Sequence, residues 1–220
     1  MADDVPTPAL DELPVFPLPN VVLFPGTVIP LHVFESRYRE LAHDALERSR
    51  LLAVARLRPG YESDYYGRPP MYGIAGIGYV IASDELDDGR FNLLVRGVGR
   101  VDIGTELPPD KSYRRVQARR LIDTRSARPS ELCILHEQLV TLCDRLADYL
   151  PKGGDELRQL VRNEEAPGGC ADVISSALVT DPDERQAILE MLDPADRVDS
   201  ALDCVGRLLS KVGPKKDLLN

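Results

Sequence analysis

Residues 13–46, LPVFPLPNVVLFPGTVIPLHVFESRYRELAHDAL, decide how the chain begins to fold. The stretch places five prolines inside an apolar run and then changes abruptly to a helical pattern. Proline fixes φ and has no N–H to donate, so such a run favours extended backbone that bends instead of crossing the middle of a flat sheet. Pro25 and Gly26 predict a tight turn, in which the glycine adopts a positive φ.

Residues 27–35 of this stretch alternate as a strand does. One face consists of Ile29, Leu31 and Val33. The opposite face is also largely apolar, which is the pattern of a strand covered on both sides. Because Pro30 cannot donate a ladder hydrogen bond, we predict an edge strand. From Ser36, the predicted N-cap, apolar residues recur with the 3.6-residue period of a helix.

Strand patterns resume after that helix. β-Branched residues are frequent in LLAVARL (51–57), YGIAGIGYVIA (72–82), RFNLLVRGVGRVDI (90–103) and YRRVQARRLID (113–123). Asp88 and Gly89 carry the signal of a β-hairpin. The sequence therefore predicts an α+β protein that begins with a half-closed, mostly antiparallel β barrel containing one helix.

The last part of the chain has a helical pattern. Residues 129–150 space leucines three or four apart over about six turns. Asp181 and Asp193 each precede a proline, which combines a capping acid with proline at the first helical position. We predict a bundle of about four helices. The expected organisation is a flexible N-terminus (1–11), the barrel (12–123), the helical bundle (124–212) and a C-terminal tail (213–220).

The composition is that of an acidic globular protein. A formal net charge of −9 and a pI near 4.9 repel phosphate backbones and anionic lipids, so neither nucleic acid nor a membrane is an expected partner. No apolar run approaches the roughly 20 residues of a membrane helix, and the first residues are acidic where a secretion signal would be basic. The four cysteines form no CxxC pair. These features predict a cytoplasmic location.

No motif in the sequence predicts catalysis. The glycines of GIAGIGYV and GVGRVDIG lie inside strand patterns, and no P-loop sequence occurs. Cys133 and His136 are one helical turn apart, but a zinc site needs three or four ligands. His32 and His43 have no serine or cysteine motif as a partner, which makes a hydrolase the weakest alternative. We expect no enzyme activity, no catalytic residue, no metal and no cofactor.

Two segments could form a binding surface. Residues 111–128 are strongly basic and include Lys111, Arg114, Arg115, Arg119, Arg120, Arg125 and Arg128. A solvated edge strand protected by its charge is the simpler interpretation, and an anion or nucleic-acid track is the alternative. The loop RPGYESDYYGRPPMY (58–72) holds half of the eight tyrosines. This loop either contacts a partner or folds back over the end of the barrel.

Several of these stretches together resemble a known family. FPLPNVVLFPGTVIPLHVFESRY (16–38), the loop 58–72, DDGRFNLLVRGVGRVDI (87–103) and YRRVQARRL (113–121) are similar to the N-terminal substrate-recognition domain of Lon protease, in its free-standing bacterial form. GCADVISSALVTDPDERQAILEMLDPADRVDSALDCVGRLL (169–209) resembles the helical part that follows the barrel in Lon. The resemblance covers residues from about 12 to 212.

The resemblance implies a PUA-like pseudo-barrel followed by a helical bundle. It also implies a non-catalytic module that binds unfolded or tagged polypeptides and is linked to a protease or chaperone, because the ATPase and peptidase modules of Lon would lie beyond this sequence. The main alternative is a PUA-like protein that binds RNA or a nucleotide through the basic strand 111–128.

Aromatic side chains of the barrel half are the expected contacts with a polypeptide. The candidates are Phe24, Phe34, Tyr38, Tyr61, Tyr65 and Tyr66. At least two of the six are expected in the core. Pro25 and Gly26 are expected to serve the turn alone.

Overall fold

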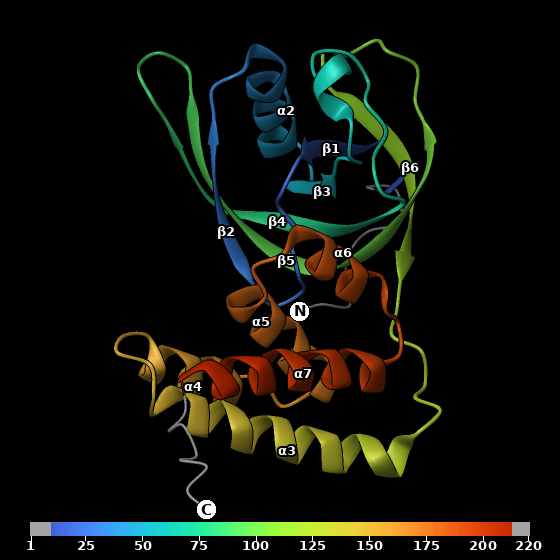
Figure 1. Ribbon diagram of the computed structural model, residues 1–220. Coiled ribbons are helices and arrows are strands. Elements are labelled where there is room, and N and C mark those ends of the chain that lie inside the picture. Colours follow the sequence, from blue (N-terminus) through green and yellow to red (C-terminus); the bar gives the residue numbers. More distant parts are fainter. Residues whose placement is uncertain (1–9, 213–220) are drawn as a thin grey trace, which may run out of the picture. The chain divides into compact units, whose positions relative to one another are not determined.

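The computed structural model describes residues 10–212 (Figure 1). Residues 10–122 and 181–190 form one compact unit, unit 1, and residues 123–180 and 191–212 form another, unit 2. The expected flexible N-terminus lies largely outside the described residues, and the expected tail 213–220 lies outside them altogether. None of the helices within 10–212 combines the length and the apolar character that crossing a bilayer requires.

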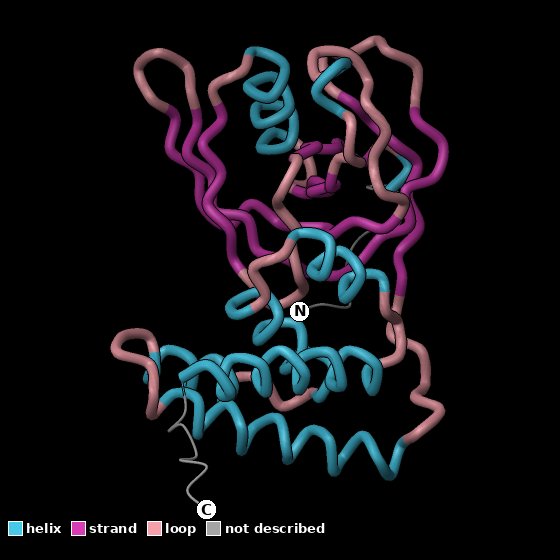
Figure 2. The backbone as a smooth tube through the Cα atoms, viewed as in Figure 1, coloured by secondary structure: helices cyan, strands magenta, loops and turns pink. Residues whose placement is uncertain are grey.

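Unit 1 is built on one six-stranded sheet (Figure 2). Its strands are β1 (Leu13–Leu18), β2 (Val28–Val33), β3 (Leu51–Arg56), β4 (Ile74–Glu85), β5 (Phe91–Glu106) and β6 (Arg114–Leu121). They follow the order β2-β5-β4-β3-β1-β6, and β5 also pairs with β6. The first part of β5 pairs with β2 and its last part with β6, so five strands close a ring and β2 extends it. All of these pairings are antiparallel except β1 with β3, which confirms the mostly antiparallel barrel.

The prolines lie where a strand has a neighbour on one side only. In β1, residues 13–15 pair with β6 and residues 15–18 pair with β3, so only Val15 has both partners. Pro14 and Pro17 therefore each remove a donor without breaking a two-sided ladder. Pro30 lies in β2, which pairs with β5 alone, as expected of an edge strand.

The outer face of β2 differs from the sequence interpretation. Leu31 and Val33 are buried, whereas Pro30 and His32 on the other face are exposed, so the strand is covered on one side and not on both. The turn before it is confirmed. Gly26 has φ 78°, and its N–H donates to the carbonyl of Gly97 at 2.9 Å.

Helix α2 (Ser36–Glu47) packs its apolar face into the barrel core. Its buried residues are Tyr38, Leu41, Ala42 and Ala45. The ring of Tyr38 stacks on that of Phe16 in β1, with 4.4 Å between the ring centroids. The N-cap is Glu35, not Ser36, and its side chain makes no capping hydrogen bond. Packing of the apolar stripe, and not a capping side chain, therefore fixes this helix.

Helix α6 (Pro182–Glu190) belongs to unit 1, although it lies between helices of unit 2 in the sequence. Asp183 pairs with the buried Arg56 at 2.7 Å, and Gln186 donates to the carbonyl of Ile74 at 2.9 Å. Arg100 of β5 donates to the carbonyl of Leu189 at 2.8 Å. The expected bundle over 124–212 is thus interrupted at α6, because the polar partners of this helix lie on the barrel.

Unit 2 contains four helices within the described residues. They are α3 (Pro129–Ala147), α4 (Gly154–Arg162), α5 (Pro167–Leu178) and α7 (Pro194–Val212). Their core combines leucines and other aliphatic residues with three buried cysteines, Cys143, Cys170 and Cys204. Burial raises the pKa of Cys143 to about 12 and that of Cys170 to about 11, so both stay protonated thiols at neutral pH.

A buried arginine joins three segments of unit 2. Arg197 of α7 is fully buried and pairs with Asp123 at 2.5 Å and with Asp172 of α5 at 3.3 Å. It also donates to the carbonyl of Met191 at 2.9 Å. Gly168 leaves the room for this, since a Cβ there would come within 2.2 Å of the guanidinium. The pairing holds α5, α7 and the start of unit 2 together.

Candidate functional site

The tyrosine-rich loop 58–72 is closed at its base by backbone contacts. Leu57 and Met71 form a β-bridge, and the N–H of Arg58 donates to the carbonyl of Pro70 at 2.9 Å. Between these ends, the chain forms the short helix η1 (Tyr61–Asp64). The loop is therefore an ordered excursion from β3, and its tyrosines have defined neighbours.

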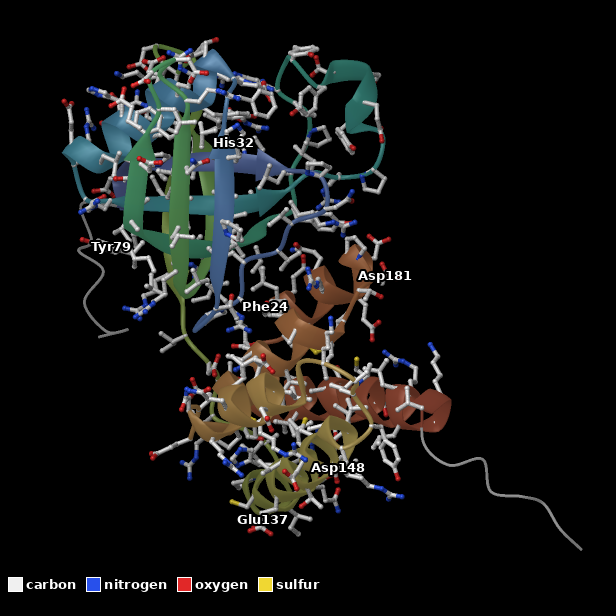
Figure 3. The ribbon with its side chains drawn as sticks, turned by 90° about the vertical axis from the view of Figure 1, so that its left-hand side faces the viewer. Phe24, His32, Tyr79, Glu137, Asp148 and Asp181 are labelled. Atoms are coloured by element: carbon white, nitrogen blue, oxygen red, sulfur yellow. The ribbon has the colours of Figure 1, made fainter. Side chains whose placement is uncertain are left out.

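The six predicted aromatic residues do not form one surface. Phe24 and Tyr38 belong to the core, in agreement with the expectation that at least two would be buried. Tyr61 and Tyr65 are half-buried. Phe34 is 62% exposed and Tyr66 is 87% exposed. Phe24 lies before β2, and His32 lies within it and not at the loop (Figure 3).

An arginine that the sequence interpretation missed organises the tyrosines. The guanidinium carbon of Arg37 lies 4.6 Å from the ring centroid of Tyr38, 5.3 Å from that of Tyr65 and 5.9 Å from that of Tyr66. Glu35 pairs with Arg37 at 3.0 Å and accepts a hydrogen bond from the Tyr65 hydroxyl at 2.9 Å. We call these five residues the Arg37–tyrosine cluster. Cation–π contacts and the shared carboxylate fix the loop to the start of α2.

A cavity of about 270 Å³ lies beside this cluster, entirely within unit 1. Its buried wall is formed by Pro17, Tyr38, Leu57, Pro69 and Tyr113. Its exposed rim is formed by Tyr66, Gly67, Arg68, Pro109 and Ser112. Arg37, Tyr65, Lys111 and Arg114 complete the lining. We call this cavity the arginine–tyrosine pocket. It combines an apolar floor with hydrogen-bond donors at its side, the usual chemistry of a ligand site.

Carboxylates outside the lining compensate its four cations. Arg68 and Arg114 both pair with Glu106, at 2.7 Å and 2.8 Å. Lys111 pairs with Asp44 at 2.8 Å and with Glu40 at 3.4 Å. Within residues 10–212, no aspartate or glutamate contributes to the lining itself. The lining therefore contributes cations, and the carboxylates that pair with them lie outside it.

The pKa shifts around the pocket follow from burial and from these pairs. Burial raises the pKa of Tyr38 to about 12, although Arg37 opposes the shift. The pKa of Tyr113 is raised by burial and by its hydrogen bond to Asp44. The pKa of Lys111 is raised, chiefly by its hydrogen bond to Asp44. At neutral pH Tyr38 and Tyr113 are thus neutral donors and Lys111 is a cation.

The basic strand 111–128 is largely neutralised by acids. Besides Lys111 and Arg114, Arg115 pairs with Glu12 and Asp110, and Arg119 pairs with Asp102. Arg128 pairs with Glu131, Asp196 and Asp199. A track that binds phosphates needs cations free to replace counterions, and these arginines already have carboxylate partners.

His32 and His43 each lie close to a polar side chain of another residue. The Nδ1 atom of His32 lies 2.8 Å from the Asn92 side-chain oxygen on the exposed face of β2. The ligand atoms of His43, Asp44 and Glu47 lie within 4.8 Å of one another on α2. In this group, Oδ2 of Asp44 already pairs with Lys111 and accepts a hydrogen bond from the Tyr113 hydroxyl.

A β barrel followed in the sequence by a mainly helical unit defines the architectural class of the protein. The substrate-binding domain of the ATP-dependent protease La (LON) has a family model that matches residues 12–207. The chain belongs to this family, as the sequence resemblance implied.

Relatives and solved structures agree with this assignment. The chain is 30% identical over 210 residues to a Lon protease of Paraburkholderia phytofirmans and 26% identical over 205 residues to Lon protease 2 of Myxococcus xanthus. These matches cover 92% and 93% of this chain but only 25% and 24% of the relatives, so the chain spans about a quarter of their length.

Two solved structures share the fold. The N-terminal domain of the Mycobacterium avium complex Lon protease superposes with a TM-score of 0.69 at 20% identity, covering 89% of this chain and 98% of that one. A Lon N-terminal domain protein from Xanthomonas campestris gives 0.63 at 23% identity, covering 87% and 97%. Both confirm the predicted barrel with a helical region after it.

Proposed function

We propose that this protein is a non-catalytic polypeptide-binding module that recognises substrates for Lon-type proteolysis, and that unfolded segments bind at the arginine–tyrosine pocket. The observation that carries the proposal is Tyr66, which is 87% exposed at the rim of a cavity with an apolar floor. A large aromatic ring is costly to leave in water, and aromatic side chains are the typical anchors of protein interfaces.

The surroundings of Tyr66 support this role. The rings of Tyr66 and Tyr65 meet edge to face, with 5.2 Å between their centroids. The guanidinium carbon of Arg37 lies over the Tyr66 ring, 5.9 Å from its centroid. The ring is therefore partly ordered before a partner arrives, which lowers the entropy lost on binding. The chain belongs to the family of Lon substrate-binding domains, and an exposed aromatic surface is consistent with that family.

The alternative of an RNA or nucleotide binder has less support. Its phosphate contacts would come from the basic strand 111–128, where Arg114, Arg115 and Arg119 are paired with carboxylates. Displacing those carboxylates would remove much of the gain from each phosphate contact. Binding of RNA is expected to be weak, salt-sensitive and indifferent to sequence.

The test is binding of β-casein, an unfolded protein, to the Tyr66→Ala variant. Affinity is expected to fall by about tenfold, as for the loss of an aromatic anchor, with an unchanged melting temperature. The matched control is Tyr79→Ala, because Tyr79 is also a surface tyrosine but lies on β4 outside the pocket lining. Equal affinities of the wild type and Tyr66→Ala would move the binding site away from this pocket.

A further inference from the structure

The charge of the pocket lining is opposite to that of the protein. The sequence has 36 acidic and 27 basic residues, yet the lining contains Arg37, Arg68, Lys111 and Arg114 and, among the residues that the structure describes, no acidic residue. Their partners Glu35, Glu40, Asp44 and Glu106 lie outside the lining, so this part of a chain with a net charge of −9 is balanced in charge. An anionic group is therefore repelled less here than over the rest of the surface.

The donors of the pocket are partly unused by the protein. Lys111 has three N–H groups and pairs with two carboxylates, and Arg68 pairs with Glu106 through Nη1. Both side chains line the pocket together with the exposed Ser112 and Tyr66. A carboxylate entering the pocket could accept hydrogen bonds from these cations without displacing their existing partners.

The floor of the pocket suits an aromatic ring. It consists of proline, leucine and tyrosine side chains, and its volume of about 270 Å³ accommodates one ring with its attached backbone. Arg37 already stacks on three tyrosines, so a further ring at this place would extend an existing arrangement of cation and π faces. The apolar floor and the cationic side of the pocket together favour a ligand that has both an aromatic and an anionic group.

We infer that the arginine–tyrosine pocket selects an aromatic residue that has a carboxylate beside it. The carboxylate is either the free C-terminus of the client or the side chain of a neighbouring aspartate or glutamate, since both present the same group. This inference rests on the proposed function and names the substrate class of that site. Such a pocket allows the acidic protein to bind a carboxylate-bearing segment that the rest of its surface repels.

The experiment measures binding of matched, labelled Gly/Ser-rich peptides by fluorescence anisotropy. One peptide ends in Phe with a free carboxylate, the second is its C-terminal amide, and the third ends in Ala with a free carboxylate. A fourth carries an internal Phe-Asp pair and an amidated end. The peptide with the Phe carboxylate is expected to bind about tenfold more tightly than the amide and the Ala peptide, as for one charge-assisted contact and one aromatic anchor.

The fourth peptide identifies the source of the carboxylate. Binding of the Phe-Asp amide as tight as that of the Phe carboxylate supports recognition of an acidic side chain, and binding of the Phe carboxylate alone supports recognition of a chain terminus. Equal affinities of the Phe carboxylate and its amide, with the Phe-Asp peptide no tighter, would overturn the inference.

A pair of arginine variants tests the pocket itself. Arg68→Gln removes a rim cation, and Arg119→Gln removes another surface arginine that also pairs with one carboxylate but lies outside the lining. Arg68→Gln is expected to weaken the Phe carboxylate about three- to tenfold and to leave the amide unchanged, whereas Arg119→Gln changes neither. Equal effects of the two variants would contradict the inference.

The outcome separates this inference from the proposed function. If all four peptides bind equally and lose affinity in Tyr66→Ala, polypeptide binding at the pocket stands and the carboxylate preference falls. If β-casein and the peptides are all indifferent to Tyr66→Ala, the site itself is wrong and the inference falls with it.

Discussion

Helices α6 and α7 begin with the same local signal but belong to different units. Asp181 and Asp193 each accept a hydrogen bond from the N–H two residues later, at 2.9 Å, and each is followed by proline. Helix α6 nevertheless lies in unit 1 and α7 in unit 2. The difference teaches that a start signal fixes where a helix begins, whereas the residues on its buried face decide where it packs.

Helices α6 and α7 each pack through a buried arginine, but the arginine belongs to the helix in α7 and to the barrel in α6. In α7, the helix itself supplies the buried cation, Arg197, and its partner Asp172 is also buried. In α6, the barrel supplies the buried cation, Arg56, and the partner Asp183 on the helix is 69% exposed. Loss of a partner is costlier where both charges are out of water, so α7 is expected to be the more sensitive of the two.

The largest effect is expected for Arg197→Met. This change leaves Asp172 buried without its cation and should lower the free energy of unfolding of unit 2 by about 3–5 kcal/mol, measured by urea denaturation. The double variant Arg197→Met/Asp172→Leu should recover part of the loss, since no buried charge is then uncompensated. A loss below about 1 kcal/mol would show that the pair is solvated in solution.

Ile188→Ala tests whether α6 contributes to the stability of the barrel unit. Ile188 is 1% exposed, and its truncation should cost about 2–4 kcal/mol through the cavity that it leaves. Hydrogen exchange should report the loss at β4, to which Gln186 of the same helix donates. Faster exchange in α3 and α7 with none in β4 would assign α6 to unit 2 and remove the comparison.

The capping acids should differ modestly. Asp193 accepts from the N–H of Ala127 at 3.2 Å as well as from its own helix, whereas Asp181 accepts from the N–H of Asp183 in its own helix. Asp193→Ala is expected to cost about 1–2 kcal/mol and Asp181→Ala about 0.5–1 kcal/mol, by thermal denaturation of each variant. Equal costs would mean that the contact with Ala127 contributes nothing.

The smallest effect concerns pH. Hydrogen bonds, chiefly from the N–H of Ala195 and then from Ser126 and the N–H of Ala127, lower the pKa of Asp193. Its stabilisation is therefore complete above the unfolded-state pKa of about 3.9 and is lost as pH falls through the lower folded-state value. The stability difference between wild type and Asp193→Asn should shrink as the pH is lowered from 7 into that range. A difference independent of pH would contradict the assigned hydrogen bonds.

The sequence predicted those elements that depend on residues adjacent in the sequence. Pro30 indicated the edge strand because a missing N–H acts at its own position, and Gly26 indicated the turn because φ is a local property. The exposed Tyr66 was among the predicted contacts. In contrast, the sequence could not show that Phe24 and Tyr38 are buried while Tyr66 is exposed, since an aromatic residue in an apolar run is equally compatible with core and surface.

The sequence did not predict that the arginine–tyrosine pocket would form. Arg37 and Arg68 come from segments far from Lys111 and Arg114, and no motif or spacing marks that these residues would line one cavity with Tyr66. The only local signal was the adjacency of Arg37 to Tyr38. The carboxylates Glu106 and Asp44 that neutralise these cations are also far from most of them in sequence, so the basic strand looked freer than it is.

The sequence by itself determined the strands, the helix starts after Asp181 and Asp193, the family and the presence of tyrosines in one loop, because backbone dihedrals, caps and apolar periods act over a few residues. Only the tertiary structure decided that α6 belongs to the barrel unit, that most cations of the basic strand are paired, and that four cations and four tyrosines surround one cavity. Those outcomes depend on contacts between segments tens of residues apart, whose free energy is set by burial and charge pairing once the sheet has closed.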